Sequence, residues 1–183
     1  MTLRGLVADA YDYRGFIFFG LMVDGDRCSL LEYNVRLGDP ETQAVLPLLD
    51  SDPAELCAAI LDGSLSRFPL AWKAGFSCAP VAVAQGYPGA YRKGEPIAID
   101  ELTLAECGAK IFFAGTELDT DGLACGLGKG ATEGGILRTS GGRVLAVAAV
   151  ADSPETARKN AYAGLAAVDF EGMDFRKDIG IES

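Results

Sequence analysis

Histidine is missing from this 183-residue chain. Its absence excludes Ser-His-Asp and Cys-His nucleophilic catalysis, because both schemes need an imidazole as the general base. It also excludes metal sites that are ligated by histidine. Any chemistry that this chain performs must therefore use carboxylates, amides, cations and backbone groups.

Positive charge is scarce as well. Lysine and arginine together number 16 against 26 acidic residues, so the formal net charge is -10. The cations are scattered along the sequence rather than clustered, which argues against nucleic acid as a partner. No apolar run approaches the ~20 residues that a membrane helix needs, and the N-terminus lacks the layout of a signal peptide. We therefore expect a cytoplasmic protein without a membrane partner.

The cysteines follow no recognised pattern, because they are odd in number, widely spaced and free of any C-x-x-C pair. The five are Cys28, Cys57, Cys78, Cys107 and Cys125. Such a set favours neither a disulfide framework nor a zinc site. We expect reduced thiols, most of them buried.

The first third of the chain begins with a predicted β-hairpin. Residues 12–23 are rich in β-branched and aromatic side chains, and the DGDR turn at 24–27 leads into a second strand over 28–37. A helix over 41–52 is expected next, broken near its proline.

A second helix has clear start and stop signals. Asp52 is placed as the N-cap, with Pro53 in the first helical position and Glu55 two residues later. Gly63 is placed to end it.

The rest of the chain changes character towards short strands separated by glycine and proline turns. Strands are expected near 78–84, 109–113 and 136–150. A last helix is expected from Ser153, with Pro154 in the first helical position. The sequence therefore predicts an α+β protein with a domain boundary between residues 66 and 67.

The segment 30-LLEYNVRLGDPETQ-43 places Glu32, Asn34 and Arg36 at every second position of the second hairpin strand. Side chains alternate between the two faces of a strand, so these three are expected to form one polar row. The residues between them, expected to point towards a buried backing, are Leu31, Tyr33 and Val35.

The polar row has two interpretations. A carboxylate and an amide oxygen about 7 Å apart along a strand can both reach a Mg²⁺ ion that also binds phosphate, and a guanidinium suits a phosphoryl group or an anionic substrate. An isolated E-x-N-x-R pattern is also what the solvated face of an antiparallel strand presents. The pattern alone leaves both open.

The whole of LLEYNVRLGDPETQ, however, closely resembles the LExNxRFGDPETQ segment of the glycinamide ribonucleotide synthetase family, also called phosphoribosylamine-glycine ligases. The similarity continues, in the family's order, in YRGFIFFGLM upstream and in SDPAELCAAILDGSL, GYPGAYRKGEPI, IFFAGTEL, SGGRVLAVAAV and FRKDIG downstream. Leu37 stands where the family usually has Phe, and Phe113 stands where the family often has His. The resemblance covers nearly the whole chain.

This resemblance implies an ATP-grasp enzyme that uses ATP to join glycine to 5-phosphoribosylamine through a glycyl phosphate, giving glycinamide ribonucleotide, ADP and phosphate in purine synthesis. The family's substrate-binding domain, lid and phosphate-binding lysines precede the segment that matches YRGFIFFGLM. The chain is therefore expected to be a C-terminal portion, with residues 1–66 closing the ATP-grasp domain and 67–183 forming a β-rich domain. The chain is expected to be inactive without the N-terminal half of the ligase, which is either joined to it or paired with it as a separate polypeptide.

The resemblance also implies roles for individual residues. Glu32 and Asn34 would ligate the Mg²⁺ (or Mn²⁺) that bridges the ATP phosphates, and Arg36 would steady the acyl phosphate. Leu31 resembles the apolar residue that packs beneath the adenine ring. The residues expected to face the glycine or phosphoribosylamine pocket are Asp39, Glu41 and Thr42.

One alternative function and two uncertain loops remain beside this interpretation. The chain could be a non-catalytic binding or regulatory module, or a remnant, derived from such a ligase. GLGKGATEGG at 126–135 lacks the Ser or Thr that a phosphate loop carries after its lysine, which favours a surface loop over 119–137. GYPGAYRKG at 86–94 suits either a nucleotide-contacting loop or a tight turn.

Overall fold

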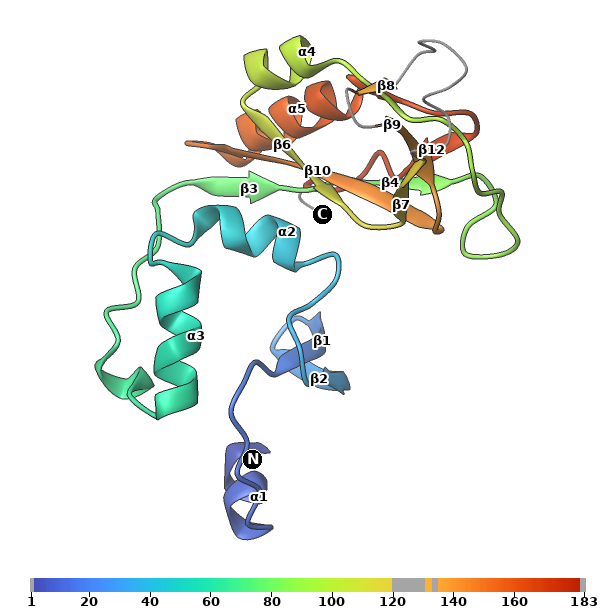
Figure 1. The fold of residues 1–183 in the computed structure, drawn as a ribbon. Helices are drawn as coiled ribbons and strands as arrows, with labels where there is room; N and C mark the ends of the chain where they lie inside the picture. The colour runs from blue at the N-terminus through green and yellow to red at the C-terminus, as the bar shows by residue number, and fades with distance from the viewer. Residues whose placement is uncertain (1, 120–130, 133–134, 182–183) are drawn as a thin grey trace. The chain divides into compact units, whose positions relative to one another are not determined.

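The computed structural model describes residues 2–119, 131–132 and 135–181. The chain divides into two compact units, one formed by Met1–Thr42 with Leu49–Lys73 and the other by Gln43–Leu48 with Ala74–Ser183 (Figure 1). The domain boundary expected between residues 66 and 67 stays a prediction.

The first unit contains the predicted hairpin. Strands β1 (Phe18–Asp24) and β2 (Arg27–Asn34) pair antiparallel from Phe18 opposite Asn34 to Asp24 opposite Arg27. Gly25 sits in the connecting turn with a φ of 55°, a left-handed conformation that glycine adopts at little cost. A short helix, α1 (Thr2–Ala8), precedes the hairpin and was not expected from the sequence.

The helix signals after the hairpin are also confirmed. Helix α3 (Pro53–Asp62) begins after Asp52, whose carboxylate accepts hydrogen bonds from the amides of Ala54 and Glu55, and it ends at Gly63 with a φ of 77°. The helix expected over 41–52 is shorter, because α2 (Thr42–Val45) passes into the 3₁₀ segment η1 (Leu46–Leu48) at the proline.

The second unit is built on a five-stranded antiparallel sheet. Its longest strand, β10 (Arg143–Ala151), pairs at its two ends with β4 and β3 and along its middle with β6, while β12 pairs with the far edge of β4. The partner strands are β3 (Phe76–Cys78), β4 (Val81–Ala84), β6 (Ala109–Phe113) and β12 (Met173–Phe175).

Smaller strand pairs flank this sheet. β7 pairs with β9 and β9 with β8, and β5 pairs with β11. These strands are β5 (Ala98–Ile99), β7 (Thr116–Asp119), β8 (Ala131–Thr132), β9 (Gly135–Thr139) and β11 (Val168–Asp169). The prediction of a loop over 119–137 is wrong at both ends of this range, because these ends belong to the paired strands β7 and β9. Residues 120–130 and 133–134 lie outside the described part of the chain.

Two helices pack on the large sheet, α4 (Glu101–Glu106) and α5 (Pro154–Leu165) (Figure 1). Helix α5 begins after Ser153, as expected, and the hydroxyl of this N-cap accepts a hydrogen bond from the amide of Thr156. Gly164 allows the close approach of α5 to the sheet, since a Cβ there would lie 2.6 Å from the Cβ of Ala109 and 3.0 Å from a methyl group of Val147.

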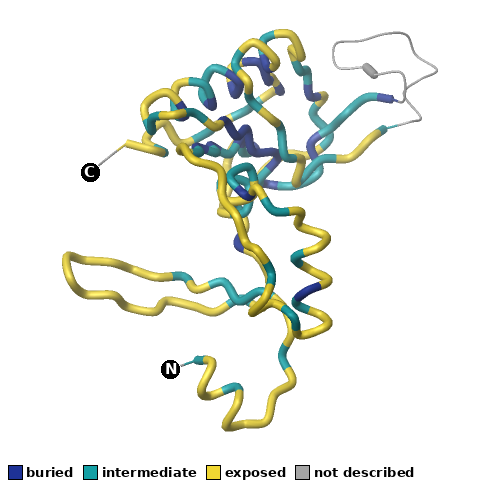
Figure 2. Tube along the Cα trace, turned by 90° about the vertical axis from the view of Figure 1, so that its left-hand side faces the viewer, coloured by how far each residue is buried: buried dark blue, intermediate teal, exposed yellow. Residues whose placement is uncertain are grey.

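The hydrophobic core lies in this second unit, as the dark segments of Figure 2 show. Six consecutive residues of β10, from Val144 to Ala149, are buried. A strand that is covered on both faces needs apolar residues at every position, which explains this continuous run. The most deeply buried large side chains around it include Ile97, Leu145 and Leu165.

The C-terminal FRKDIG segment is anchored to α5. The guanidinium of Arg158 donates to the carbonyls of Ile179 (3.1 Å) and Lys177 (2.7 Å). The Tyr162 hydroxyl donates to the carbonyl of Arg176 (2.6 Å) and accepts from the amide of Ile179 (3.2 Å). The Arg158 guanidinium also lies 4.7 Å from the centre of the Tyr162 ring, a cation–π distance.

The cysteines only partly follow the expectation. The four described thiols are free, but Cys28 and Cys57 are exposed, contrary to the expected burial, because both lie on solvent-facing positions of the first unit. Cys78 is buried beside the C-terminal segment, and this burial raises the pKa of its thiol, which disfavours the reactive thiolate.

We predict that residues 2 to about 64 exchange their amide hydrogens at least about 10-fold faster than the strands of the second unit. The hairpin is a two-stranded sheet with two unpaired edges, whereas β10 has partners on both sides. Hydrogen exchange of the whole chain, followed by mass spectrometry, measures this difference. Better protection of the hairpin than of β10 would contradict the prediction.

We also predict that Arg158→Ala lowers the free energy of unfolding of the second unit by about 1–3 kcal/mol, because two carbonyls lose a charged donor. Urea denaturation measures the loss. Lys159→Ala is the matched control, since this neighbouring cation is exposed. Equal stability of the two variants would mean that the C-terminal segment does not stabilise the unit.

Candidate functional site

The polar row of the hairpin is held together by its own side chains. The amide nitrogen of Asn34 donates to a carboxylate oxygen of Glu32 at 3.0 Å. The guanidinium of Arg36 donates to the amide oxygen of Asn34 at 3.3 Å. The structure therefore brings these three residues together in one chain of hydrogen bonds, although only Asn34 among them is half-buried.

Arg36 reaches this row differently from the expectation. The second strand ends at Asn34, not at residue 37, so strand alternation does not place Arg36. Its side chain instead turns back towards Asn34, and its second terminal nitrogen donates to the carbonyl of Leu37 at 2.8 Å. These two contacts fix the guanidinium beside the strand end.

A β-bulge lies within the row. Glu32 pairs with Gly20 and Leu30 pairs with Leu21, so β2 contributes the extra residue Leu31 between two consecutive residues of β1. A bulge bends and twists the strand and changes the direction in which its side chains point. The only sequence feature that could have indicated this bulge is Gly20 within β1.

Gly20 leaves room for the Glu32 side chain. A Cβ at position 20 would lie 2.8 Å from the Cγ of Glu32, closer than real contacts of this kind. The absence of a side chain opposite Glu32 therefore lets its carboxylate lie along the strand towards Asn34. Sequence analysis did not identify Gly20 as part of the site, although an interior strand glycine often marks a close approach.

The expectation of a buried backing behind the row is wrong for this chain. Leu31 is 62% exposed, Tyr33 49% and Val35 74%. Figure 2 shows most of the hairpin as exposed. The reason is that a two-stranded sheet has no interior of its own, so its apolar face is covered only where another element packs on it. The ring of Tyr33 contacts that of Phe19 edge to face, with 5.2 Å between the ring centres.

The turn after the row is tightly packed around Gly38. A Cβ at this buried position would meet a carboxylate oxygen of Glu41 at 2.5 Å and the ring of Phe18 at 3.0 Å. The carbonyl of Gly38 accepts hydrogen bonds from both the amide and the hydroxyl of Thr42. Thr42 therefore closes the turn, whereas Asp39 within it is exposed.

The oxygen atoms of the row fit a hard divalent cation in type but not in number. Glu32 offers carboxylate oxygens and Asn34 an amide oxygen, the donors that Mg²⁺ accepts. Within the described residues, no group of three or more histidine, cysteine, aspartate or glutamate side chains is placed to hold a metal ion. The oxygens of the row alone are too few to complete the coordination shell of such a cation, which also takes ligands from phosphates, water or further protein groups.

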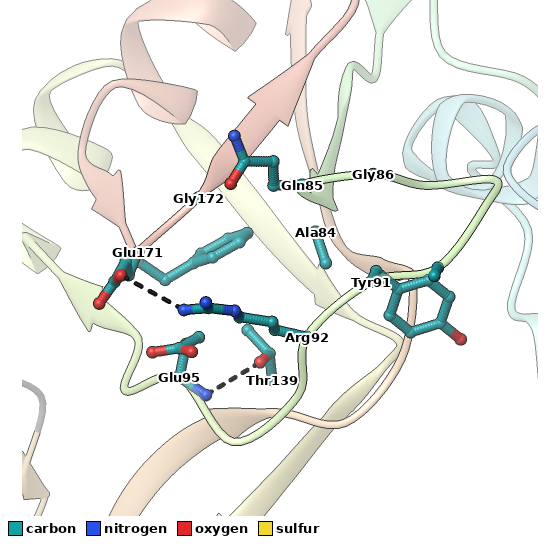
Figure 3. A pocket seen from close by; sticks show the side chains of 11 residues that line it. Ala84, Gln85, Gly86, Tyr91, Arg92, Glu95, Thr139, Glu171 and Gly172 are labelled. Atoms are coloured by element: carbon teal, nitrogen blue, oxygen red, sulfur yellow. Dashed lines mark hydrogen bonds and ion pairs between the residues drawn. The ribbon is translucent and has the colours of Figure 1, made fainter.

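A second candidate site is a pocket of about 430 Å³ in the second unit (Figure 3). Its polar lining comes from the segment that follows β4, from the end of β9 and from the turn after β11. The polar residues are Gln85, Tyr91, Arg92, Glu95, Thr139 and Glu171. The sequence had indicated only that GYPGAYRKG, within this segment, forms a tight turn or a nucleotide-contacting loop.

Similarity to known proteins identifies the lineage of the chain. Residues 77–182, more than half of its length, match the C domain of phosphoribosylglycinamide synthetase. The chain belongs to the phosphoribosylglycinamide synthetase family. Residues 1–42, which include the polar row, match the ATP-grasp (A) domain of the same synthetase. The resemblance inferred from LLEYNVRLGDPETQ and the α+β fold class are thereby confirmed.

Family members align with nearly all of this chain. It is 41% identical over 182 residues to the phosphoribosylamine–glycine ligase of Chlorobaculum tepidum and 44% identical over 178 residues to a bifunctional purine biosynthetic protein of Schizosaccharomyces pombe. These alignments cover 100% and 97% of the chain but only 40% and 21% of the relatives.

A solved family structure supports the same assignment. The crystal structure of the phosphoribosylamine–glycine ligase from Thermotoga maritima superposes with a TM-score of 0.71 at 37% identity, over 97% of this chain and 40% of that one. The chain thus spans about 40% of the length of the single-function ligases that it matches. No helix in the described part is long and apolar enough to cross a membrane.

We predict that Gly20→Ala in this family member disturbs the row, because the new methyl group displaces the Glu32 side chain. Overpacking of about 1 kcal/mol corresponds to roughly fivefold faster amide exchange in the hairpin. The side-chain amide signals of Asn34 in NMR spectra are expected to shift as well. Gly5→Ala is the matched control, since a Cβ there meets nothing within 4 Å. Unchanged Asn34 signals in Gly20→Ala would show that Gly20 does not position the row.

Proposed function

We propose that this chain is the C-terminal part of a phosphoribosylamine–glycine ligase. The reaction joins glycine to 5-phosphoribosylamine, consumes ATP through a glycyl phosphate and yields glycinamide ribonucleotide, ADP and phosphate in purine synthesis. The observation that carries this proposal is the hydrogen-bonded row of Glu32, Asn34 and Arg36, located inside the segment that matches the ATP-grasp domain.

The row has the chemistry that phosphoryl transfer needs. Mg²⁺ (or Mn²⁺), when bound, neutralises charge on the ATP phosphates. Glu32 and Asn34 would hold it through their side-chain oxygens. Arg36 would hold the oxygens of the acyl phosphate, because a planar guanidinium donates two parallel hydrogen bonds to a phosphoryl group.

The hydrogen bonds within the row have a mechanistic consequence. The Asn34 amide nitrogen donates to Glu32, which leaves its oxygen directed away from that carboxylate and towards Arg36. The carboxylate, the amide oxygen and the guanidinium therefore follow one another in space as they do in sequence. A row that is ordered before substrate binds loses less conformational entropy when it meets the phosphates.

The neighbouring residues would complete the substrate pocket. Leu31, exposed at the bulge, offers an apolar surface for an adenine ring. Asp39 and Glu41 would face glycine or the ribosylamine, where a carboxylate can accept hydrogen bonds from an amine. Thr42 would act through the turn, because its hydroxyl already donates to the carbonyl of Gly38.

The proposed ligase also needs ATP-binding groups beyond those of the row. The row supplies too few oxygen atoms to hold a metal ion alone, and the curated ligases are more than twice as long as the chain. We therefore propose that the N-terminal part of such a ligase, working with these residues in the cytoplasm, supplies the remaining ATP-binding groups. The alternative is a non-catalytic binding or regulatory module.

Reconstitution tests the proposal. The chain is mixed with the N-terminal part of the Chlorobaculum tepidum ligase that precedes the aligned region, in the presence of MgATP. ADP release that depends on both glycine and phosphoribosylamine is expected, whereas the chain alone is expected to release none. Absence of activity with a part that is folded and bound to the chain would favour the non-catalytic module.

In the reconstituted enzyme, Glu32→Gln and Asn34→Ala are each expected to lower turnover by at least ~100-fold, the loss typical when electrostatic stabilisation of a transferring group is removed. Asp26→Asn is the matched control, because it removes a carboxylate from the exposed turn of the same hairpin. Far-UV circular dichroism checks that the variants stay folded. Near-normal turnover of Glu32→Gln at limiting Mg²⁺ would show that Glu32 is not a metal ligand.

A further inference from the structure

Strand β6 leaves one edge of the large sheet open. It pairs with β10 in an unbroken register, from Phe113 opposite Leu145 to Ala109 opposite Ala149. In the described part of the chain it pairs with no other strand. The other strands at the borders of this sheet, β3 and β12, have three residues each, whereas β6 has five. Among the described strands, β6 is therefore the longest open edge of the sheet.

The ladder shows which backbone groups of β6 point out of this edge. The amide of Ala114 donates to the carbonyl of Val144 at 3.0 Å, so Ala114 faces β10. The amide of Val147, the residue opposite Ile111, donates at 3.0 Å to the carbonyl of Pro80 on the other side of β10, so Ile111 does not bond to β10. Backbone groups of an antiparallel strand alternate between its two sides, and every second residue therefore faces outward. The outward residues are Ala109, Ile111 and Phe113. Within the described residues, their amides and carbonyls have no backbone partner at this edge.

The sequence of β6 does little to protect the edge. Open edges are commonly blocked by proline, by several charges or by a bulge. β6 reads Ala-Lys-Ile-Phe-Phe, with Lys110 as its single charge, no proline and no shift of register against β10. Phe113 is 56% exposed. Unpaired backbone groups beside apolar side chains favour pairing with a further strand.

A second copy of the same strand meets the geometric requirements. A two-fold axis pairs the strand with itself in the antiparallel direction. Outward residues have to face outward residues, so the axis passes through a residue and not between two. An axis at Lys110 places two like charges opposite each other, which is unfavourable. An axis at Phe112 leaves Ala109 without a strand residue opposite it. An axis at Ile111 pairs all five residues and gives about six backbone hydrogen bonds.

The side chains are self-complementary in the register centred on Ile111. Phe113 lies opposite the small Ala109 of the second copy. Lys110 lies opposite Phe112 of the second copy, which places a cation beside an aromatic ring. Ala109 is on the face that α5 covers, because a Cβ at Gly164 of that helix would lie 2.6 Å from the Cβ of Ala109. The exposed Phe113 ring would therefore be covered by α5 of the second copy.

We propose that this chain forms a two-fold symmetric homodimer in which β6 pairs with β6 of a second copy, with the axis at Ile111. The large sheet then continues from one copy into the other. β6 contributes no residue to the polar row or to the lining of the pocket. The dimer is thus a property of this chain beyond the proposed function.

Sedimentation equilibrium of the whole chain, from about 5 µM to about 1 mM, tests the association. A reversible dimer with a Kd below about 1 mM is expected. Phe113→Lys is expected to raise this Kd at least about 10-fold, because it removes the apolar contact while its own position is exposed in the single chain. Ile181→Lys is the matched control, since it changes an exposed apolar residue outside β6 in the same way. Amide spectra show whether each variant is folded.

A charge swap tests the register. Phe112→Lys is expected to raise the Kd at least about 10-fold, because a second lysine then lies opposite Lys110. Adding Lys110→Glu is expected to bring the Kd back to within about 3-fold of the native value, since opposite charges then face each other. A general loss of stability caused by Phe112→Lys would not be repaired in this way. Failure of the second change to rescue the dimer would overturn the register centred on Ile111.

Hydrogen exchange locates the interface directly. At about 5 µM, the outward amides of Ile111 and Phe113 are expected to exchange faster than the inward amides of Lys110 and Phe112. At about 1 mM, exchange of the outward amides is expected to slow at least about 3-fold. A monomer at every concentration, or a dimer without this added protection, would overturn the proposal. A dimer that Leu21→Lys in the hairpin abolishes, but Phe113→Lys leaves intact, would overturn it as well.

Discussion

The pairing of β10 is the interaction on which the second unit depends. This strand has partners on both edges, with β3 and β4 pairing with its two ends and β6 with its middle. Its backbone groups are thus satisfied in a region that excludes water, which permits six consecutive buried residues. Helix α5 can cover this sheet closely only because Gly164 has no side chain. The pocket and the anchored C-terminal segment are both attached to this framework.

The hairpin of the first unit follows a different principle. It lacks a core, so its polar row is organised by hydrogen bonds between side chains and by the space that Gly20 and Gly38 leave for two glutamates. Its apolar face is exposed, as Leu31 and Val35 show. Exposure of an apolar face to water is unfavourable. A further protein segment or a ligand that covers this face would therefore be bound more tightly by the burial of its apolar surface.

The two candidate sites differ in the chemical groups that they present. The row carries oxygen ligands and a guanidinium, groups suited to a metal ion and a transferring phosphoryl group. The pocket carries the half-buried carboxylate of Glu95 and an exposed Arg92, of which a terminal nitrogen lies 3.9 Å from Glu171. Neither site uses histidine, which agrees with its absence from the sequence. Carboxylates, amides and guanidinium groups are the chemical groups that these sites offer instead.

The sequence by itself determined the features that depend on local chemistry. The hairpin turn, the Asp52 cap, the Ser153 cap and the family resemblance all follow from residues close together in the chain. Only the tertiary structure decided the features that join distant residues. The bulge at Leu31, the contact of Gly142 with two tyrosine rings and the pocket around Glu95 belong to this group. Pattern rules describe one element at a time, whereas these features depend on which backbones approach each other, and packing between separate elements decides that.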